Sequence, residues 1–588
     1  MMKDPLPKLA RILLISAALT TPFLSADRTL GCEAGVCDGT VTGDGRPICW
    51  KLRVQVDTPN DLHYFAAGLE HYEGLGPAAF SYLGAGPHDD SQGGPARQGV
   101  NSRGLAIGFN AFNGGDWQEL HHFALGQAAT TAQVDTHLAD MTTLGTIHYY
   151  IDAAGDATLW ESDIDPSGHW AYNTRAPARA DVLRDFDGDG DEISYAGWVG
   201  RANTIYMHTD ATDSLLYGEE DRTAAAQTVP GRLVDGGAMN VRTLASEYFR
   251  HDVLATDNSV SSMIVHGVRP DEDPRLTTMW TALGHAEAAI FVPVWIHGIE
   301  ADGTDAVPDH LDHGSGACVY EPAKGLITDG VDEDALQLRT LPVESHFFDL
   351  VLDELLPEWR ARDWHDGDVA DGIGHEMKRV QERMDADAYS LLDCLYATDP
   401  DNHAPRRSRI DAWTVVRRTV DLAATAIDDD GTIIEAVWNY GDGYEGTADT
   451  HEYDLPGTYL VSFTATDDDS VSFTDWEFVV VPAPTAAPEA ASDAFAAVVL
   501  KPCHPNPFNP GTVISFVLPQ AARVRLSVYD LSGRLVRTLL HDSEAAAGRN
   551  DAYWNGRNDS GRRLEAGVYL CRLEAGAFRA TGRMVMLK

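Results

Sequence analysis

The chain has 588 residues and a formal net charge of −46. A chain of this length is expected to form about three or four domains, and its 44% hydrophobic content suffices for packed cores. The strong negative charge argues against nucleic acid or an anionic lipid surface as a partner. It does not indicate any particular chemistry, because a well-solvated protein surface has the same composition.

Residues 1–31 have the pattern of an export signal. Three cations, Lys3, Lys8 and Arg11, precede an apolar run from Ile12 to Leu24, and small residues follow. The apolar run is too short for a transmembrane helix, which needs about 20 residues. We therefore predict a signal peptide or propeptide over 1–31, and a protein that is secreted or held at the cell surface.

Cys32 opens a stretch with the pattern of a β-hairpin. A strand-like run leads to the turn residues Thr-Gly-Asp-Gly (42–45), and a second run spans 47–56. If the chain is cut before Cys32, this residue carries both a thiol and a free α-amine. Because the amine can take the thiol proton, Cys32 then becomes a nucleophile with its own base. The alternative is a structural or disulfide-bonded cysteine.

This stretch resembles the N-terminal-nucleophile (Ntn) hydrolases, in the branch with penicillin V acylase, bile salt hydrolase and isopenicillin-N acyltransferase. The likeness rests on Cys-x-x-Gly-Val (32–36), Asp-Gly-Arg-Pro (44–47) and Trp-Lys (50–51). It implies an Ntn-hydrolase domain over 32–398, a four-layer αββα sandwich with a helical tail. It also implies cleavage of a linear, non-peptide C–N amide bond, or acyl transfer, with no cofactor required for catalysis.

Three further residues receive roles from this resemblance. Asn110, which ends a predicted strand, corresponds to an oxyanion-hole donor through its backbone N–H. Asn203, in Arg-Ala-Asn, corresponds to the side-chain amide that completes the hole. Lys51 stands where acylase relatives carry an Arg beside the nucleophile. The alternatives are turn residues without a function for the two Asn and an exposed strand lysine for Lys51.

Two positions depart from the pattern of the Ntn relatives. Val54 replaces the acid that normally contacts the α-amine, and Asp57 could substitute for it only if the strand bulges. Ser262 stands where the penicillin acylase relatives carry an Arg. These departures predict altered, lower or lost activity.

The pattern of the first domain mixes strands and helices without a regular βαβ period. Runs such as 104–110 and Thr146–Ile151 predict strands, and Val241–Phe249 and Gly374–Leu395 predict helices. This alternation favours a layered α+β domain.

An acidic segment interrupts this domain. Asp185, Asp187, Asp189 and Asp191 place carboxylates at alternate positions, with glycine at the sixth, as in a calcium loop. The twelfth position is Ala196, where a bidentate Glu or an Asp is expected. The pattern therefore leaves two interpretations, a structural calcium site and the favoured plain acidic surface loop.

The seven cysteines of an exported chain leave one unpaired. Cys37 and Cys49 flank the predicted turn symmetrically, so we expect that a cross-strand disulfide is feasible. The odd thiol is assigned to Cys32. Spacing does not reveal the pairing of Cys318, Cys394, Cys503 and Cys571.

The last third of the chain predicts two all-β immunoglobulin-like sandwiches. Residues 409–481 resemble a PKD domain through Trp-Asn-Tyr-Gly-Asp-Gly (438–443) and Pro-Gly-Thr-Tyr (456–459). An Ala/Pro-rich linker follows over 482–498. Residues 499–588 resemble the C-terminal sorting domain of type IX secretion, which is related to the flagellar hook-capping immunoglobulin-like domain. The alternative is a β-sandwich without a sorting role.

These resemblances define the expected function and its competitor. The enzyme would act on a small-molecule amide and meet the type IX secretion machinery, and its PKD domain would provide a cell-surface or polysaccharide contact. The competing interpretation is a catalytically inactive Ntn scaffold that serves in surface binding or adhesion through the PKD domain. Cys32 favours the enzyme and Val54 favours the scaffold.

Overall fold

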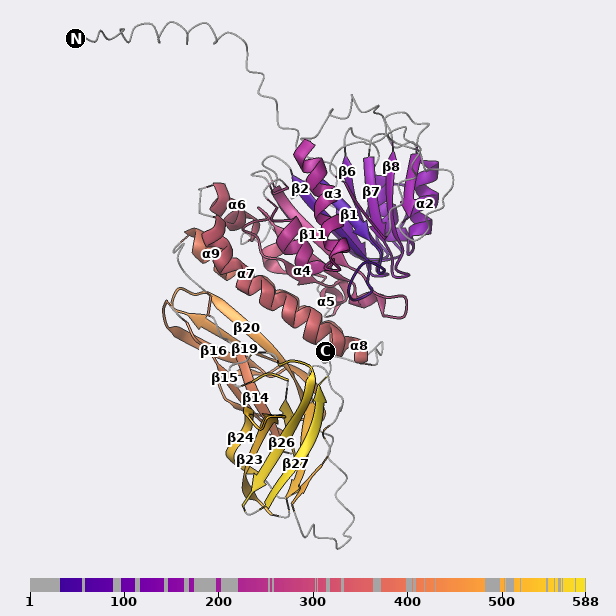
Figure 1. Ribbon diagram of the computed structural model, residues 1–588. Coiled ribbons are helices and arrows are strands. Elements are labelled where there is room, and N and C mark those ends of the chain that lie inside the picture. Colours follow the sequence, from indigo (N-terminus) through magenta and orange to yellow (C-terminus); the bar gives the residue numbers. More distant parts are fainter. Residues whose placement is uncertain are drawn as a thin grey trace, which may run out of the picture.

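The protein is described here by a computed structural model (Figure 1), in which three β-rich regions follow one another along the chain. No helix among the described residues is long and apolar enough to cross a membrane. The description covers residues 32–586 except for 55–58, 88–96, 112–116, 142–145, 163–168, 174–196, 202–219, 252–253, 256–258, 302, 304, 313–317, 329–332, 363–371, 398–403, 406–408, 417, 429, 482–497, 502, 504–511, 519, 546–547, 555, 559–561, 563 and 577.

The first sheet contains the predicted hairpin at its centre. All of its neighbouring strands pair antiparallel, and the two hairpin strands place Gly35 opposite Trp50. In spatial order the sheet contains β10 (Trp198–Arg201), β1 (Glu33–Cys37), β2 (Ile48–Val54), β11 (Ser259–His266), β12 (Thr278–Leu283) and β13 (Val292–Val294).

The second sheet is an antiparallel meander in which each strand pairs with the next one along the chain. One of its strands occupies the range that alternation predicted, Thr146–Ile151. The sheet contains β3 (Asn60–Phe65), β4 (Tyr82–Pro87), β5 (Gln98–Asn101), β6 (Ala106–Ala111), β7 (Thr146–Ile151), β8 (Ala157–Ser162) and β9 (His169–Asn173).

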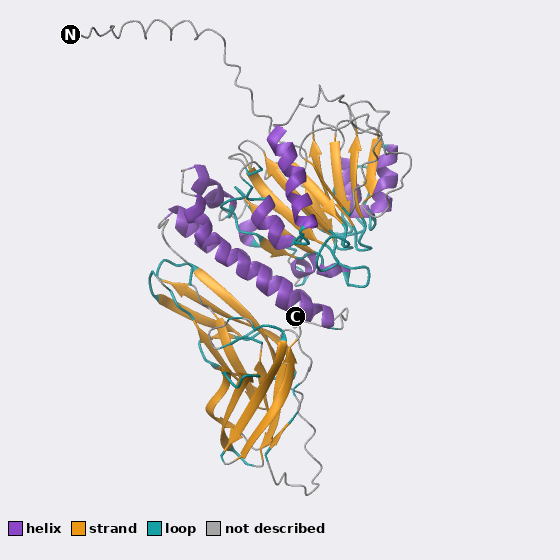
Figure 2. Cartoon of the chain, viewed as in Figure 1, coloured by secondary structure: helices purple, strands orange, loops and turns teal. Residues whose placement is uncertain are grey.

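The two sheets pack face to face. Because side chains alternate along a strand, Ile147 and Tyr149 of β7 join the core that is shared with the first sheet, whereas Tyr150 points to the other side. There it packs under two helices, α1 (Trp117–Gln127) and α2 (Thr131–Asp140). Figure 2 shows helices on the outer faces of both sheets.

The outer face of the first sheet is covered by helices that come later in the chain. Trp50 of β2 is fully buried there and makes an edge contact with Tyr248, with ring centroids 5.9 Å apart. The remaining helical elements of this region are α3 (Glu220–Asp235), α4 (Val241–Thr243), η4 (Leu244–Tyr248), η5 (Pro274–Leu276), α5 (Ile296–Glu300), η6 (Asp309–Leu311), α6 (Tyr320–Thr328), α7 (Glu333–Leu350), η8 (Val351–Leu355), α8 (Leu356–Ala361) and α9 (Ile373–Ala397).

Gly35 allows β1 to pack against its neighbours in the first sheet. A Cβ atom at this position would lie 2.2 Å from Cζ2 of Trp50 and 2.7 Å from the main-chain oxygen of Val199. Neither neighbour can yield easily, because Trp50 is enclosed in the core and the oxygen belongs to a strand. The presence of glycine at this position of the Cys-x-x-Gly-Val motif is therefore explained by the lack of space for a side chain.

We expect Gly35→Ala to destabilise the first domain by about 1–3 kcal/mol, the usual cost of overpacking a core. Differential scanning calorimetry would show a lower unfolding temperature for that domain. Gly43→Ala is the matched control, because no atom lies within 4 Å of a Cβ placed there. Equal unfolding temperatures for the two variants would contradict the steric explanation.

The disulfide between Cys37 and Cys49 that the sequence made feasible does not form. In the antiparallel register Cys37 lies opposite Ile48, and Cys49 lies opposite Val36. The two cysteines are therefore offset by one residue, so their side chains point to opposite faces of the sheet. All seven cysteines are free thiols, and burial raises the pKa of both Cys37 and Cys49 above the ordinary range.

The remaining strands form three sheets beyond α9 (Figure 1). The first is β18 (Thr450–Glu452), β15 (Thr419–Thr425), β14 (Arg409–Val416), β25 (Gly548–Trp554), β22 (Thr512–Leu518) and β21 (Val499–Leu500). The second is β17 (Glu445–Gly446), β16 (Ile433–Asn439), β19 (Gly457–Asp467) and β20 (Ser472–Val481). The third is β24 (Leu535–Ala545), β23 (Ala522–Asp530), β26 (Gly567–Ala575) and β27 (Phe578–Met586).

One of these sheets runs through both of the C-terminal sandwiches. Strand β14 pairs with β25, with Thr414 opposite Ala552 and Val415 opposite Asp551. The two sandwiches keep separate hydrophobic cores on either side of this pairing. Sequence patterns predicted two sandwiches joined by a linker, and the continuous sheet is an additional connection that they did not indicate.

A charged cluster joins the last sandwich to the helical part of the first domain. Arg557, just after β25, donates a 2.6 Å hydrogen bond to Glu354 of η8, and Asp475 and Glu477 of β20 lie close by. Burial raises the pKa of all three carboxyl groups, and His346 of α7 partly offsets this at Asp475. Burial by itself would lower the pKa of Arg557. The neighbouring carboxylates have the larger effect, so the pKa of Arg557 is raised.

We expect Arg557→Met to loosen this junction, and to loosen it more as the pH rises. A carboxyl group whose pKa is raised by docking favours the docked state when protonated, so this contribution is lost as the pH rises through the raised pKa. Without Arg557 the three carboxylates also repel one another. Hydrogen exchange of the β25 amides should be roughly tenfold faster at pH 8 than in the parent chain, after correction for the intrinsic rate. Unchanged exchange would show that the cluster does not hold the sandwich.

Candidate functional site

Cys32 lies one residue before β1, at the rim of the first sheet, and is partly exposed. Its Sγ lies 3.9 Å from the main-chain oxygen of Val54, the last residue of β2. This proximity follows from the antiparallel hairpin, because Glu33 pairs with Leu52 and the start of β1 meets the end of β2. The thiol is therefore positioned by the hairpin that the sequence predicted.

Asn110 reaches Cys32 from the second sheet. It lies in β6, is fully buried, and its Nδ2 donates a 3.3 Å hydrogen bond to the main-chain oxygen of Cys32. The resemblance assigned Asn110 a role through its backbone N–H, and the structure shows that its side-chain amide also contacts Cys32. Asn110 therefore ties the main chain of Cys32 to the opposite sheet.

Lys51 completes a chain of contacts across the two sheets. Its Nζ donates a 2.8 Å hydrogen bond to the main-chain oxygen of Phe109 and another bond to Oδ1 of Asn110. With 3% of its surface exposed, Lys51 is not the exposed strand lysine of the alternative interpretation. Burial lowers the pKa of its ammonium group, and the charges of Cys32 and Glu33 oppose this effect.

Two arginines add positive charge near the same thiol, and sequence reasoning gave them no role. Burial and the neighbouring Arg97 lower the pKa of Arg53 to about 9, whereas a negative charge on Cys32 acts in the opposite direction. Burial also lowers the pKa of Arg97, again opposed by Cys32. Arg53 could have been found from the sequence, because it is two residues from Lys51 and so shares its face of β2. Arg97 lies one residue before β5 and has no such signal.

The two departures from the Ntn pattern lie inside the first sheet. Val54 is buried and supplies its main-chain oxygen, but no carboxylate, to the surroundings of Cys32. Ser262 of β11 lies opposite Leu52 and is fully buried, so it brings no cation to the site. The nearest acid in the sequence, Glu33, is buried beside Cys32 and acts electrostatically on Lys51.

The Asp-Gly-Arg-Pro segment anchors the hairpin turn. Asp44 contacts His266 at 2.8 Å and also accepts a bond from Arg46, while Nε of Arg46 donates to Glu272 at 2.9 Å. Burial favours the neutral acid, but His266 and Arg46 outweigh it and hold the pKa of Asp44 well below its ordinary range. This contribution to stability is present above the ordinary carboxyl pKa and is lost as the pH falls. The motif thus fixes the turn opposite the Cys32 end of the hairpin.

Several predicted residues lie outside the described part of the chain. They are Asn203, Asp57 and the acidic segment Asp185, Asp187, Asp189 and Asp191. Among the described residues, no group of three or more His, Cys, Asp or Glu side chains is arranged to hold a metal ion.

Family comparisons identify the two C-terminal sandwiches. The PKD domain family matches residues 402–480, and the FlgD Ig-like domain family matches residues 507–577. These segments are a PKD domain and a FlgD-like immunoglobulin domain. Neither match includes Cys32, Lys51 or Asn110.

Comparisons with individual proteins give short similarities. The pre-pro-metalloprotease PrtV of Vibrio cholerae serotype O1 is 37% identical over 71 residues, which are 12% of this chain and 8% of PrtV. The crystal structure of the PKD1 domain of that protein is 30% identical and covers 13% of this chain and 94% of its own, with a TM-score of 0.12. The crystal structure of the PKD1 domain of Vibrio anguillarum Epp is 26% identical. It covers 14% of this chain and 99% of its own, with a TM-score of 0.13. This chain thus spans under a tenth of the length of its curated relative.

Proposed function

We propose that this chain is an exported Ntn cysteine amidase that cleaves a linear, non-peptide C–N amide bond. The contacts from Lys51 through Asn110 to Cys32 carry the proposal, because they bring together three residues assigned from sequence likeness alone. The face-to-face sheets with helices on both outer faces support the four-layer αββα sandwich of that class.

In the first step the thiol of Cys32 becomes the nucleophile. After cleavage before Cys32, the new α-amine takes the thiol proton, and the sulfur attacks the amide carbonyl carbon. The carbonyl π electrons move to oxygen, and the resulting oxyanion needs hydrogen-bond donors aimed at it. The backbone N–H of Asn110 and the side chain of Asn203 are the proposed donors.

In the second step the intermediate collapses and the C–N bond breaks. The leaving nitrogen takes the proton that the α-amine held, and an acyl thioester remains on Cys32. A water molecule then gives a proton to the amine and attacks the thioester, which releases the carboxylic acid and the thiol. An amine in place of water would give acyl transfer by the same route.

The surrounding charges favour the anionic states of this route. Lys51, Arg53 and Arg97 each interact electrostatically with a negative charge on Cys32. Cations near a cysteine stabilise the thiolate, which is the reactive form. Their burial strengthens the effect, because charges are screened less away from water.

The direct test is a screen of N-acyl amides with purified mature protein. Intact-mass measurement should show a chain that begins at Cys32, and at least one amide should release its amine with a matching amount of acid. The screen should include N-acyl homoserine lactones, penicillin V and bile-salt conjugates as chemically distinct linear amides. An active chain that begins upstream of Cys32 would contradict the proposed base.

The second candidate is an inactive scaffold displayed at the cell surface. Val54 favours it, because no carboxylate at that position holds the α-amine. In this case no amide would be cleaved, whichever residue the mature chain begins with. The same screen therefore separates the two candidates.

We further propose that the protein is extracellular or surface-held, with the C-terminal sandwich acting as a type IX sorting domain. The PKD and FlgD-like domains support this placement. In cells with type IX secretion, a chain ending at Val481 should remain in the periplasm while keeping amide hydrolysis. Fractionation that finds it outside as efficiently as the full chain would reject the sorting role.

A further inference from the structure

The core of the last sandwich contains two cysteines that the proposed amidase does not use. Cys503 lies between β21 and β22, and Cys571 lies in β26, with exposed fractions of 6% and 1%. Both belong to one hydrophobic core, whereas the other buried cysteines of the chain belong to the core of the first domain. Each is therefore the only cysteine within the core that surrounds the other.

The sulfur of Cys571 fills a space that a glycine of the next strand leaves open. Cys571 lies directly opposite Gly582 of β27, and opposite residues of a sheet point to the same side. A Cβ atom at Gly582 would lie 2.8 Å from the sulfur of Cys571 and 3.5 Å from Cδ2 of Leu500. Leu500 of β21 borders this space, so the segment that leads to Cys503 passes beside it.

Cys503 reaches the same part of β27. Its sulfur lies 3.7 Å from the main-chain oxygen of Arg583, the residue that follows Gly582. The sulfurs of Cys503 and Cys571 thus lie beside successive residues of one strand, inside one core. They are also close enough for a negative charge on Cys503 to raise the pKa of Cys571. The two side chains therefore converge, as those of a disulfide must.

We propose that Cys503 and Cys571 form a disulfide bond when the chain folds outside the cytoplasm. The inference rests on the export proposed above, because disulfides form in oxidising compartments and thiols stay reduced in the cytosol. The structure describes the pair in its reduced form. The bond would be a covalent closure of the last sandwich that depends on the compartment.

The chemistry is thiol–disulfide exchange with a protein disulfide as the oxidant. The thiolate of one cysteine attacks the oxidant and forms a mixed disulfide, and the thiolate of the other then attacks that bond and releases the oxidant. In total the two thiols lose two protons and two electrons. The oxidant takes up both and leaves as a dithiol.

Burial determines when this bond can form. It raises the pKa of Cys571 to about 11, and it also raises the pKa of Cys503. Because the thiolate is the reactive form, a pair that is already enclosed in the core exchanges slowly. We therefore expect the bond to form while the sandwich folds.

The bond would close a ring around most of the last sandwich. The chain between Cys503 and Cys571 contains β22, β23, β24 and β25, and β25 pairs with β14 of the PKD domain. A crosslink across a long loop stabilises the folded state mainly by restricting the unfolded chain. It would also hold the segment that follows the linker on the sheet of β26 and β27.

Peptide mapping of the chain from Cys32 onward tests the proposal. The signal peptide of a bacterial host directs this chain to the periplasm, so the result does not depend on residues 1–31. After alkylation in denaturant without reductant and then proteolysis, mass spectrometry should find the peptides of Cys503 and Cys571 joined. Cys571→Ser should leave Cys503 alkylated, whereas Cys394→Ser in the first domain should leave the link intact. Alkylation of both cysteines in the parent, or a link from either to another cysteine, would overturn the proposal.

Calorimetry of the parent before and after reduction with TCEP gives a second measurement. Reduction should lower the unfolding temperature of the last sandwich by about 10 °C or more, as expected for a disulfide that closes a long loop in a small domain. Cys571→Ser should unfold at one temperature in both conditions, which separates the lost bond from altered packing. A parent that reduction does not affect would also overturn the proposal. Amide hydrolysis should be equal in the parent and Cys571→Ser, so failure here leaves the amidase proposal standing.

Discussion

Cys32→Ala is expected to abolish amide hydrolysis by the mature chain, to at least a thousandfold below the parent. In the proposed mechanism the sulfur of Cys32, a free and partly exposed thiol, is the atom that attacks the carbonyl. Loss of a covalent nucleophile typically costs about 10⁶ in turnover, so the residual rate should be close to the assay limit. Release of amine from the best substrate of the screen measures it directly.

The controls separate chemistry from folding. Cys32→Ser should retain a trace of activity, because a hydroxyl remains a weaker nucleophile beside the same α-amine. Cys394→Ala removes a buried thiol from α9 and should leave turnover within about twofold, since no contact with the site is lost. Both Cys32 variants should unfold at the parent temperature. Activity in Cys32→Ala would exclude this residue as the nucleophile.

Lys51→Met should reduce kcat/KM by about a hundredfold, the loss usual for one preorganised polar group of an active site. Methionine fills a similar volume but removes the donors to Phe109 and Asn110 and the positive charge beside Cys32. Because burial lowers the pKa of the Lys51 ammonium group, the parent should lose rate as the pH rises and Lys51 gives up its proton. The variant should lack this limb of kcat/KM against pH, and a purely structural role of Lys51 would not produce that difference.

A conservative variant distinguishes the charge of Lys51 from its hydrogen bonds. Lys51→Arg keeps the charge and should restore part of the rate, although the wider guanidinium cannot reproduce both short contacts. Arg269→Met is the matched control, because this cation contacts Asp44 at the opposite end of the hairpin. A Lys51→Met enzyme with the parent pH profile would remove Lys51 from the proposed machinery.

Local patterns in the sequence predicted the elements of this protein well. Strand β7 occupies the range that alternation gave, and the hairpin of β1 and β2 surrounds the predicted turn. The PKD motifs lie in the segment that the PKD family matches. Such features depend on the spacing of hydrophobic residues and on turn residues within about ten positions. Both can be recognised in the sequence without knowledge of the fold.

Contacts between distant segments were decided by the tertiary structure. Likeness to a family assigned Asn110, but only the packing of two sheets shows its amide on the main chain of Cys32. Arg97 joins the site from a position just before β5 that no periodic pattern marks. The Cys37–Cys49 disulfide that the sequence made feasible is excluded by a one-residue offset in register. A shift of one residue exchanges the faces of a strand, so symmetry about a turn is not sufficient to place two side chains.

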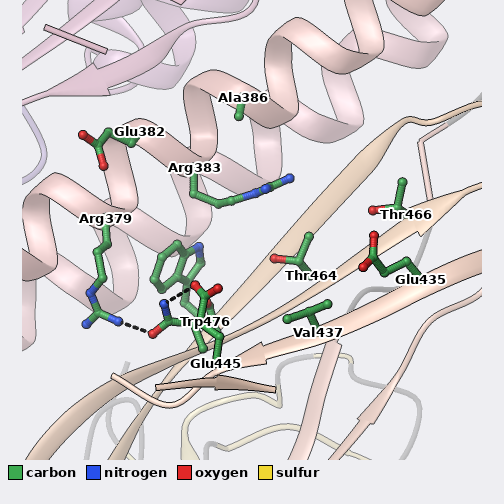
Figure 3. Close-up of a pocket in the computed structure, with 12 residues that line it drawn as sticks. Arg379, Glu382, Arg383, Ala386, Glu435, Val437, Glu445, Thr464, Thr466 and Trp476 are labelled. Atoms are coloured by element: carbon green, nitrogen blue, oxygen red, sulfur yellow. Dashed lines mark hydrogen bonds between the residues drawn. The ribbon is translucent and has the colours of Figure 1, made fainter. Parts of the chain in front are cut away.

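The arrangement of the domains likewise could be determined only from the tertiary structure. The sequence by itself determined that two β-sandwiches follow the first domain, because each has its own strand pattern and turn motifs. Only the tertiary structure decided that β14 and β25 share a sheet, that Arg557 enters an acidic cluster, and that α9 forms a cleft with the PKD face (Figure 3). Strand edges, buried charges and docked helices contact residues that are far away in the sequence. The hydrophobic period of a segment predicts its secondary structure, but it does not predict which other segment it will contact.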